Sequence, residues 1–475
     1  MRRLNSSAVG HSRILPFPGL FQWLALLAIA SLSACATPPE TVHPIPEAGP
    51  VAFESAHGPV STQKSKQIID TLEDASGDNA ILKKHLAVEE ALNQDSPLVL
   101  GNKLSLLQDG PATYAAMFAA IRAARHSINL ETYIFDDGRI GTEFADLLLA
   151  KQASGVQVNV IYDSVGCLDT PAEFFDRLRD GGIRILEFNP VNPANAHKRK
   201  WRLNNRDHRK LLVVDGRIAF LGGINISESY SSGSFSRSTK KGGKSQVGWR
   251  DTQLQVEGPV VAELQKYFMD TWARQKGPPL PEKHYFPKLV TEGKDIVRAI
   301  ASESDEPASP IYLTLLSAID HAERFVHLTN AYFVPDPHLV HALIGAARRG
   351  VDVQLILPGK SDSWLVFQAG RSHYTELLRA GIRIYERRDT VLHAKTASID
   401  GVWATIGSTN LDWRSYLHND EINAVILGAH FSRQMEAMFD QDRAASTLIE
   451  PARWQRRSPL QHMKEWVARR FEYWL

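Results

Sequence analysis

The stretch HAKTASIDGVWATIGSTN, residues 393–410, repeats the pattern of an earlier stretch, HRKLLVVDGRIAFLGGIN, residues 208–225. Both follow the rule HxKxxxxD, then six residues, then G(G/S)xN, and their histidines are 185 residues apart. A single HxK tripeptide carries little information. Two complete copies with the same internal spacing indicate the two halves of one active site.

The segment before each motif copy has the same order of expected elements, alternating helix and strand. In the first half we expect helices at 112–126, 141–154 and 172–180 and strands at 128–135, 157–162 and 184–188. In the second half we expect helices at 311–324, 337–349 and 364–379 and strands at 325–333, 352–357 and 383–386. The sequence therefore predicts an α/β protein with pseudo-two-fold duplication. Each half is expected to be a mixed, mostly parallel sheet flanked by helices, with the active site at their interface.

Each motif copy reads as a strand, a tight Asp-Gly turn and a second strand. The histidine and lysine of one copy are two residues apart, so they should point to one face of the strand. We expect His208, Lys210, His393 and Lys395 to form a catalytic set. Asp215 and Asp400 complete the motif, and we expect them to shape the hairpin turns rather than touch a substrate.

Composition and length set the domain plan. The 475 residues carry a formal net charge of +1, which argues against broad binding to nucleic acid through many phosphate contacts. We expect a signal peptide at 1–34, a tether and extension at 35–100, the two halves at 101–278 and 309–450, a linker at 279–308, and a basic, aromatic helix at 451–475.

The N-terminus has three arginines, an apolar run and then Leu32-Ser33-Ala34-Cys35, which resembles a bacterial lipobox. Cys35 would then carry lipid, and the body would face the periplasm from a bacterial envelope membrane, with the outer membrane favoured by Ala36. The alternative is an uncleaved membrane anchor. The other cysteine, Cys167, is expected to be a buried apolar residue rather than a nucleophile.

Two basic segments are open to two interpretations each. The run 198–202 with Arg206 and Arg209 is either a solvated face or a surface that attracts anionic head groups. The tail 454–475 combines aromatic and basic residues at helical spacing. It suits a membrane interface or a terminal helix docked on the body.

The paired motifs resemble the phospholipase D superfamily, and longer strings are similar to its bacterial cardiolipin synthase branch. These strings are DHRKLLVVDG at 207–216, FLGGIN at 220–225, WRD at 249–251 and GSTNLDWRS at 407–415. The resemblance implies the duplicated phospholipase D fold and a phosphohistidine intermediate. It also implies that Asp251 and Glu421 orient the histidines.

The residues suit phosphoryl transfer on chemical grounds as well. A neutral imidazole can attack phosphorus while a protonated one gives its proton to the leaving alcohol. We favour His208 as the nucleophile. The lysines would hold the non-bridging phosphate oxygens, and Asn225, Asn410 and Ser408 would offer neutral donors to them. With two lysines present we expect neither a metal ion nor another cofactor.

The expected function is transfer of a phosphatidyl group to phosphatidylglycerol, giving cardiolipin at a membrane. Phosphatidylethanolamine is an alternative donor lipid. The nearest rival is a phospholipase D that uses water and releases phosphatidic acid. A secreted nuclease and a non-catalytic lipid-binding protein are further alternatives. A lone histidine on a strand is usually a core residue, but both copies here are complete.

Overall fold

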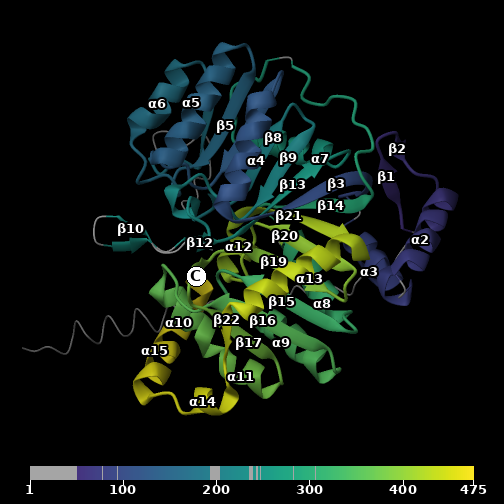
Figure 1. Ribbon diagram of the computed structural model, residues 1–475, viewed down its shortest axis with the longest axis vertical. Coiled ribbons are helices and arrows are strands. Elements are labelled where there is room, and N and C mark those ends of the chain that lie inside the picture. Colours follow the sequence, from purple (N-terminus) through teal and green to yellow (C-terminus); the bar gives the residue numbers. More distant parts are fainter. Residues whose placement is uncertain are drawn as a thin grey trace, which may run out of the picture. The chain divides into compact units, whose positions relative to one another are not determined.

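Two sheets with the same strand order, joined edge to edge into one continuous sheet, carry the two motif copies (Figure 1). The computed structural model describes residues 51–76, 79–93, 95–192, 204–234, 239–241, 244–246, 248–281, 283–304, 306 and 308–475. The expected signal peptide, Cys35, the start of the tether and the basic run 198–202 lie outside these residues.

The first sheet has the order β6, β5, β4, β8, β9, β13, β3. The bounds of its strands are β3 Leu98–Gln108, β4 Ser127–Thr132, β5 Gln157–Asp163, β6 Arg184–Phe188, β8 Lys210–Val214, β9 Ile218–Gly222 and β13 Thr252–Glu257. The helices of this half are α4 Asp109–Ala123, α5 Arg139–Ala153, α6 Ala172–Asp180 and α7 Val261–Arg274, with a short 3-10 turn η2 at Glu228–Tyr230.

The second sheet repeats this order as β17, β16, β15, β19, β20, β21, β14, with β22 added beside β17. Its strands are β14 Asp295–Ser302, β15 Phe325–Asn330, β16 Asp352–Pro358, β17 Arg383–Arg387, β19 Lys395–Ile399, β20 Trp403–Gly407, β21 Asn419–Leu427 and β22 Ser446–Leu448. The helices are α8 Pro310–Asp320, α9 Pro337–Arg348, α10 Trp364–Ser372, α11 Tyr374–Arg379, α12 Trp413–Leu417, α13 Ala429–Ala444, α14 Pro451–Gln455 and α15 Pro459–Arg469, followed by η3 Glu472–Trp474.

The expected duplication and the mixed α/β sheet are confirmed, but the expectation of mostly parallel strands is wrong. In the strand orders given above, β4, β5 and β6 and their counterparts β15, β16 and β17, which are joined by helices, pair in parallel. The hairpin strands and the two strands beyond them pair antiparallel. Tight turns make antiparallel neighbours, so the Asp-Gly hairpins themselves set this direction.

Two boundaries differ from the sequence prediction. The stretch 279–308, expected to be a linker, contains β14, which pairs with both β21 and β3 and so joins the two sheets. The single helix expected at 364–379 is divided into α10 and α11 at His373. The His373 ring contacts the carboxylates of Glu376 and Glu472 at 3.0 and 3.1 Å, which links this break to the C-terminal segment.

The extension before the first sheet is folded onto the second half. It contains β1 Phe53–Ser55, β2 Gly58–Pro59, α2 Thr62–Ser76 and α3 Asn79–Leu92. His85 on α3 lies 3.0 Å from the carboxylate of Asp400, and Glu89 accepts a hydrogen bond of 2.7 Å from the Trp403 indole. Within the described ranges, no helix is long and apolar enough to cross a membrane.

Candidate active site

Short strands that cross between the halves bring the two motif copies together. Strand β7, Arg206–Asp207, pairs in parallel with the start of β21, and β12, Trp249–Arg250, pairs in parallel with β18, Val391–Leu392. The backbone N–H of His208 donates to Asp420 O at 2.9 Å, and that of His393 donates to Arg250 O at 2.7 Å. Each histidine is therefore fixed by backbone of the opposite half.

The two histidines line one cavity of about 290 Å³. Its walls are mostly aromatic or polar, and both halves contribute. The lining residues are Tyr133, Ile134, Arg206, His208, Asn225, Tyr230 and Trp249 from the first half and Tyr332, Asp362, Ser363, Val366, His393, Asn410, Asp412, Arg414, Asn419 and Leu475 from the second. A volume of this size can hold a phosphodiester head group.

Glu421 of the second half orients His208 of the first half. Both of its carboxylate oxygens lie 3.0 Å from His208 Nδ1. Ser408 Oγ and Asn419 Nδ2 also donate to this carboxylate. Burial raises the pKa of Glu421 to about 7, against the opposing effect of Lys210. Burial, with the charges of Lys210 and Lys395, holds the pKa of His208 well below its usual value, so this imidazole is neutral.

Asp251 of the first half orients His393 of the second half in the same way. Its Oδ2 lies 2.7 Å from His393 Nδ1. Burial and the neighbouring Lys395 lower the pKa of His393 to about 4, while Asp251 acts in the opposite direction. The partnership is thus crossed: each half supplies the carboxylate for the other half's histidine, and both histidines line the cavity.

The two lysines lie beside the histidines of their own motif copies. Lys395 Nζ is 3.1 Å from His393 Nε2, and Lys210 Nζ donates to the carbonyl of His208. Burial lowers the pKa of Lys210 to about 7 and that of Lys395 to about 8. A bound anion would stabilise both ammonium groups, so the site is suited to a phosphate.

Of the three expected phosphate donors, two line the cavity and one does not. Asn225 and Asn410 are in its wall, and Asn225 Nδ2 donates to the Tyr230 hydroxyl at 3.0 Å. No group in the described part of the chain hydrogen-bonds the buried Oδ1 of Asn410. The Ser408 hydroxyl instead donates a hydrogen bond to the Glu421 carboxylate and accepts one from the Ile422 N–H. Ser408 therefore acts on His208 through this carboxylate.

The counterpart of Ser408 in the first copy is Gly223, and its missing side chain has a steric cause. A Cβ atom at this position would lie 2.2 Å from Asp251 Oδ1. The Asp251 carboxylate therefore occupies the space that a serine would need. The two copies use equivalent positions for different purposes.

Asp215 and Asp400 lie at the far ends of the motif hairpins, outside the cavity. Each has a positive φ, 53° and 57°, as the first turn residue. The Asp215 carboxylate accepts hydrogen bonds from three successive N–H groups at 125–127, and Asp400 accepts from those at 323–325. Both aspartates thus have the turn-shaping position expected from the motif, and they fix the junction between the first helix and first strand of each half.

Four aromatic residues at the site were not expected from the sequence. Tyr133 and Tyr332 each follow the first strand of their half, and each ring lies edge-on to a motif histidine, with centroids 5.1 and 5.9 Å apart. The lysines lie over these same rings. Tyr230 and Trp249 contact His393. The sequence signal that could have identified Tyr133 and Tyr332 is their equivalent position, just after the corresponding strand of each half.

The expected basic surface near the first histidine is partly interior. Arg206 lines the cavity, but Arg209 is buried and donates to the carbonyls of Glu421 and Ser302. Cys167 is buried as expected, and burial raises the pKa of its thiol to about 12. Neither Arg209 nor Cys167 is available to a substrate in the cavity.

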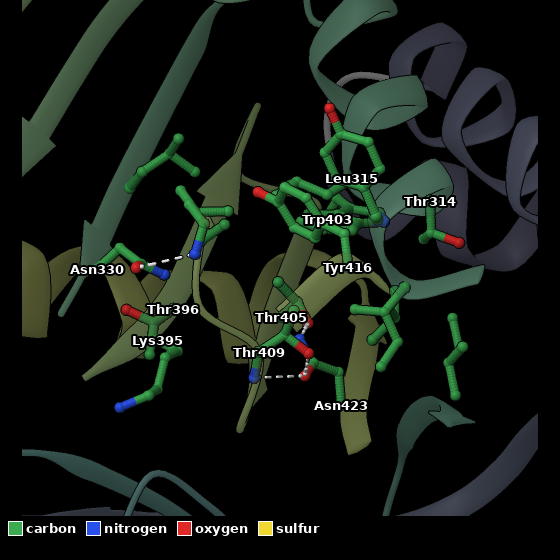
Figure 2. A pocket seen from close by; sticks show the side chains of 17 residues that line it. Thr314, Leu315, Asn330, Lys395, Thr396, Trp403, Thr405, Thr409, Tyr416 and Asn423 are labelled. Atoms are coloured by element: carbon green, nitrogen blue, oxygen red, sulfur yellow. Dashed lines mark hydrogen bonds between the residues drawn. The ribbon is translucent and has the colours of Figure 1, made fainter. Parts of the chain in front are cut away.

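A second pocket lies in the core of the second half, between α8 and strands β19 to β21 (Figure 2). Its volume is about 30 Å³, roughly the space of one water molecule. The stem of Lys395 forms one edge, and Figure 2 shows its ammonium group pointing away from Trp403 and Tyr416. This pocket is a gap in the core and has no room for a lipid.

Comparison with known proteins gives consistent matches. A family model described as a cardiolipin synthase, phospholipase D-like domain matches residues 117–235 and 315–443, one motif copy in each segment. The chain is 37% identical over 365 residues to a cardiolipin synthase A from Pseudomonas entomophila, covering 75% of this chain and 72% of the relative. A cardiolipin synthase from Geobacillus kaustophilus is 33% identical over 377 residues, covering 78% and 72%. The crystal structure of a phosphatidylserine synthase from Haemophilus influenzae has a TM-score of 0.59 at 13% identity, covering 81% of this chain and 97% of that one, and so shares the fold.

Proposed function

We propose that this chain, which belongs to the cardiolipin synthase branch of the phospholipase D superfamily, transfers a phosphatidyl group onto phosphatidylglycerol to form cardiolipin. The observation that carries the proposal is the crossed arrangement of the site. Two neutral imidazoles from distant parts of the chain face one cavity, and each is oriented by a carboxylate of the opposite half. Such a pair serves a reaction in which one ring attacks and the other moves the proton.

In the first step His208 attacks the phosphorus of the donor lipid. Glu421 holds its Nδ1, so the free electron pair of Nε2 points into the cavity. A bond forms from Nε2 to phosphorus, and the bond from phosphorus to the head-group oxygen breaks. His393, which takes up a proton when the anionic phosphate of the donor binds, gives that proton to the leaving oxygen, and glycerol leaves if the donor is phosphatidylglycerol. The lysines stabilise the charge on the non-bridging oxygens.

In the second step the roles of the imidazoles reverse. His393, now neutral, accepts the proton of the terminal hydroxyl of an incoming phosphatidylglycerol. The resulting oxygen attacks phosphorus, the bond to His208 breaks, and cardiolipin is released. His393 suits the acid role because Asp251 favours its charged form, and the donor's phosphate offsets the field of Lys395.

A hydrolase would use the same residues with water as the acceptor. The aromatic rings of Tyr133, Tyr230, Trp249 and Tyr332 give the cavity an apolar portion beside its polar lining, and this portion suits an alcohol carried on a lipid. Phosphatidylethanolamine is a second candidate donor, since the chemistry at phosphorus is the same for both lipids. We further propose that Cys35 carries lipid and that the body faces the periplasm from the bacterial envelope, with the outer membrane favoured.

The test is to incubate the purified full chain with vesicles of labelled phosphatidylglycerol. We expect equal amounts of cardiolipin and glycerol, and no turnover from the His208→Ala or His393→Ala variant. Phosphatidic acid without cardiolipin would instead identify a hydrolase. Addition of phosphatidylethanolamine then shows which lipid is the donor, because ethanolamine rather than glycerol would be released.

A further inference from the structure

The C-terminal segment carries an exposed apolar face that no other part of the described chain covers. Helix α15 packs against α10 through an inner side, where Ala468 is fully buried and Gln461 donates to Gln368 at 2.6 Å. The outer side of α15 and η3 is apolar and exposed. We call this set the C-terminal face: Leu460, Met463, Trp466, Val467, Phe471 and Trp474. Four of its members are more than half exposed, which is unusual for side chains of this size.

On this segment the basic side chains lie on the exposed side, whereas the acidic ones face the body or are paired. Arg469 and Arg470 are exposed, and the Arg470 guanidinium lies 5.0 Å from the centre of the Trp466 ring. The acids are turned inward or paired: Glu465 is buried against Arg457, and Glu472 contacts the His373 ring. Aromatic and apolar groups with cations at their border match the head-group region of an anionic bilayer.

The C-terminal face also adjoins the lining of the catalytic cavity. Leu475, the last residue, lines this cavity together with Val366 of α10. Leu475 and Val366 also pack with Ala468 in one apolar cluster. Figure 1 shows the C-terminus close to α12, which directly follows Asn410 and Asp412 of the cavity wall. A membrane lying on this face would therefore be next to the opening that a phospholipid must enter.

We infer that the C-terminal face docks the protein on an anionic lipid bilayer and holds the cavity mouth against it. This inference rests on the proposed function, because it is a phospholipid substrate that makes the orientation useful. It explains why one terminal helix has a buried side that fixes it to α10 and an apolar side that faces solvent. The helix is both docked on the body and suited to a membrane interface.

The first experiment measures contact with lipid and does not depend on catalysis. A fluorescent label on the Trp466→Cys variant of the full chain is compared with the same label on Phe286→Cys. Phe286 is the matched control because its side chain is 57% exposed, against 59% for Trp466. It also lies away from the histidines, because the neighbouring residue Tyr285 contacts the hairpin turn at Gly216. That turn is about 17 Å from the histidine end of its hairpin strand.

We expect brominated acyl chains in vesicles of phosphatidylglycerol and phosphatidylcholine to quench the label at 466 and not the label at 286. Equal quenching at the two positions would overturn the inference. A label at 466 that is insensitive to brominated lipid but self-quenches between labelled copies would also overturn it, because a second copy of the chain would then cover the face.

The second experiment links docking to turnover. The variant Leu460→Ser, Met463→Ser and Trp466→Ser removes much of the apolar face without touching the cavity wall. We expect it to lose about tenfold in turnover of phosphatidylglycerol in vesicles and to keep full turnover of a short-chain, monomeric phosphatidylglycerol. Phe286→Ser should change neither. Equal turnover by variant and wild type on vesicles would overturn the docking role. If the wild type makes no cardiolipin from either lipid, the proposed function fails instead, and lipid quenching at 466 still reports on docking.

Discussion

The two halves of the molecule share strand order, turn geometry and motif spacing, yet their histidines have different surroundings. His208 faces a carboxylate, Glu421, whose pKa is raised and which is held by two further donors. His393 faces Asp251, and the rings of Tyr230, Trp249 and Tyr332 lie around it. The comparison shows that duplication supplies a symmetric frame, while a few side chains assign different tasks to its two halves.

Removal of either imidazole should have the largest effect and should separate the two roles. We expect His208→Ala and His393→Ala each to lower kcat at least about 10⁴-fold. A phosphodiester with a p-nitrophenolate leaving group needs no acid. With it, His393→Ala should still release one equivalent of nitrophenolate in a burst and retain phosphate on the protein, whereas His208→Ala should not. A burst from His208→Ala in place of His393→Ala would reverse the assignment.

Substitution of the crossed carboxylates should have the next largest effect on kcat. The loss should be larger for Asp251, the partner of the proton donor His393, than for Glu421. Asp251→Asn removes the charge that favours the imidazolium of His393, and we expect a loss of about 10²- to 10³-fold in kcat. Glu421→Gln leaves an amide oxygen that can still accept from His208 Nδ1, so we expect about tenfold. Steady-state rates of the two variants on labelled phosphatidylglycerol test this order. Equal losses would mean that both carboxylates act only on ring orientation.

Much of this arrangement follows from the sequence. The duplication, the hairpins and most helix bounds could be predicted because they depend on local patterns, and α6 and β6 begin and end where the patterns place them. Strand β14 was missed because proline-rich and charged residues lie on both sides of it and its partners, β3 and β21, are distant in the chain.

The failures at the site have a common physical cause. Ser408 was expected to contact phosphate because its type and motif position suit a donor, but the direction of its hydroxyl depends on Glu421 from another strand. Tyr230 and Trp249 could not be predicted as site residues, because their contact with His393 exists only after the halves meet. Residue type is encoded locally, whereas the partner of a buried polar group is a tertiary property.

The two lysines offer a pH test of the comparison. Burial puts the pKa of Lys210 at about 7 and that of Lys395 at about 8 in the free site, and a lysine loses its charge as the pH rises through its pKa. Phosphate binding should therefore weaken above pH ~7, with kcat/KM falling up to about tenfold per pH unit between pH ~7 and ~8 and up to about a hundredfold per unit above that, where both groups lose their charge. Lys395→Arg keeps its charge at these pH values and should flatten the upper part of the fall. A profile of kcat/KM against pH that is the same for wild type and variant would contradict this reading.

The smallest expected effect on catalysis, and a measurable one on stability, is at the turn aspartates. Asp400 accepts from three backbone N–H groups, as Asp215 does, and its carboxylate also contacts the buried His85. Asp400→Asn should therefore destabilise the fold by about 1–3 kcal/mol and by more than Asp215→Asn does, because buried groups lose a charged partner.

This stabilisation should depend on pH in one direction. Burial opposes ionisation of Asp400, but the contacts with His85 and the backbone N–H groups outweigh it and hold its pKa below the usual value. A carboxyl with a depressed pKa stabilises the fold above its unfolded pKa of about 4 and loses that effect as the pH falls through the folded value. Urea midpoints at neutral pH should thus separate wild type from Asp400→Asn, and the gap should close in acid. A difference in urea midpoint that stays constant with pH would contradict this prediction. It would mean that the charge of Asp400 adds nothing to its hydrogen bonds with His85 and the backbone N–H groups.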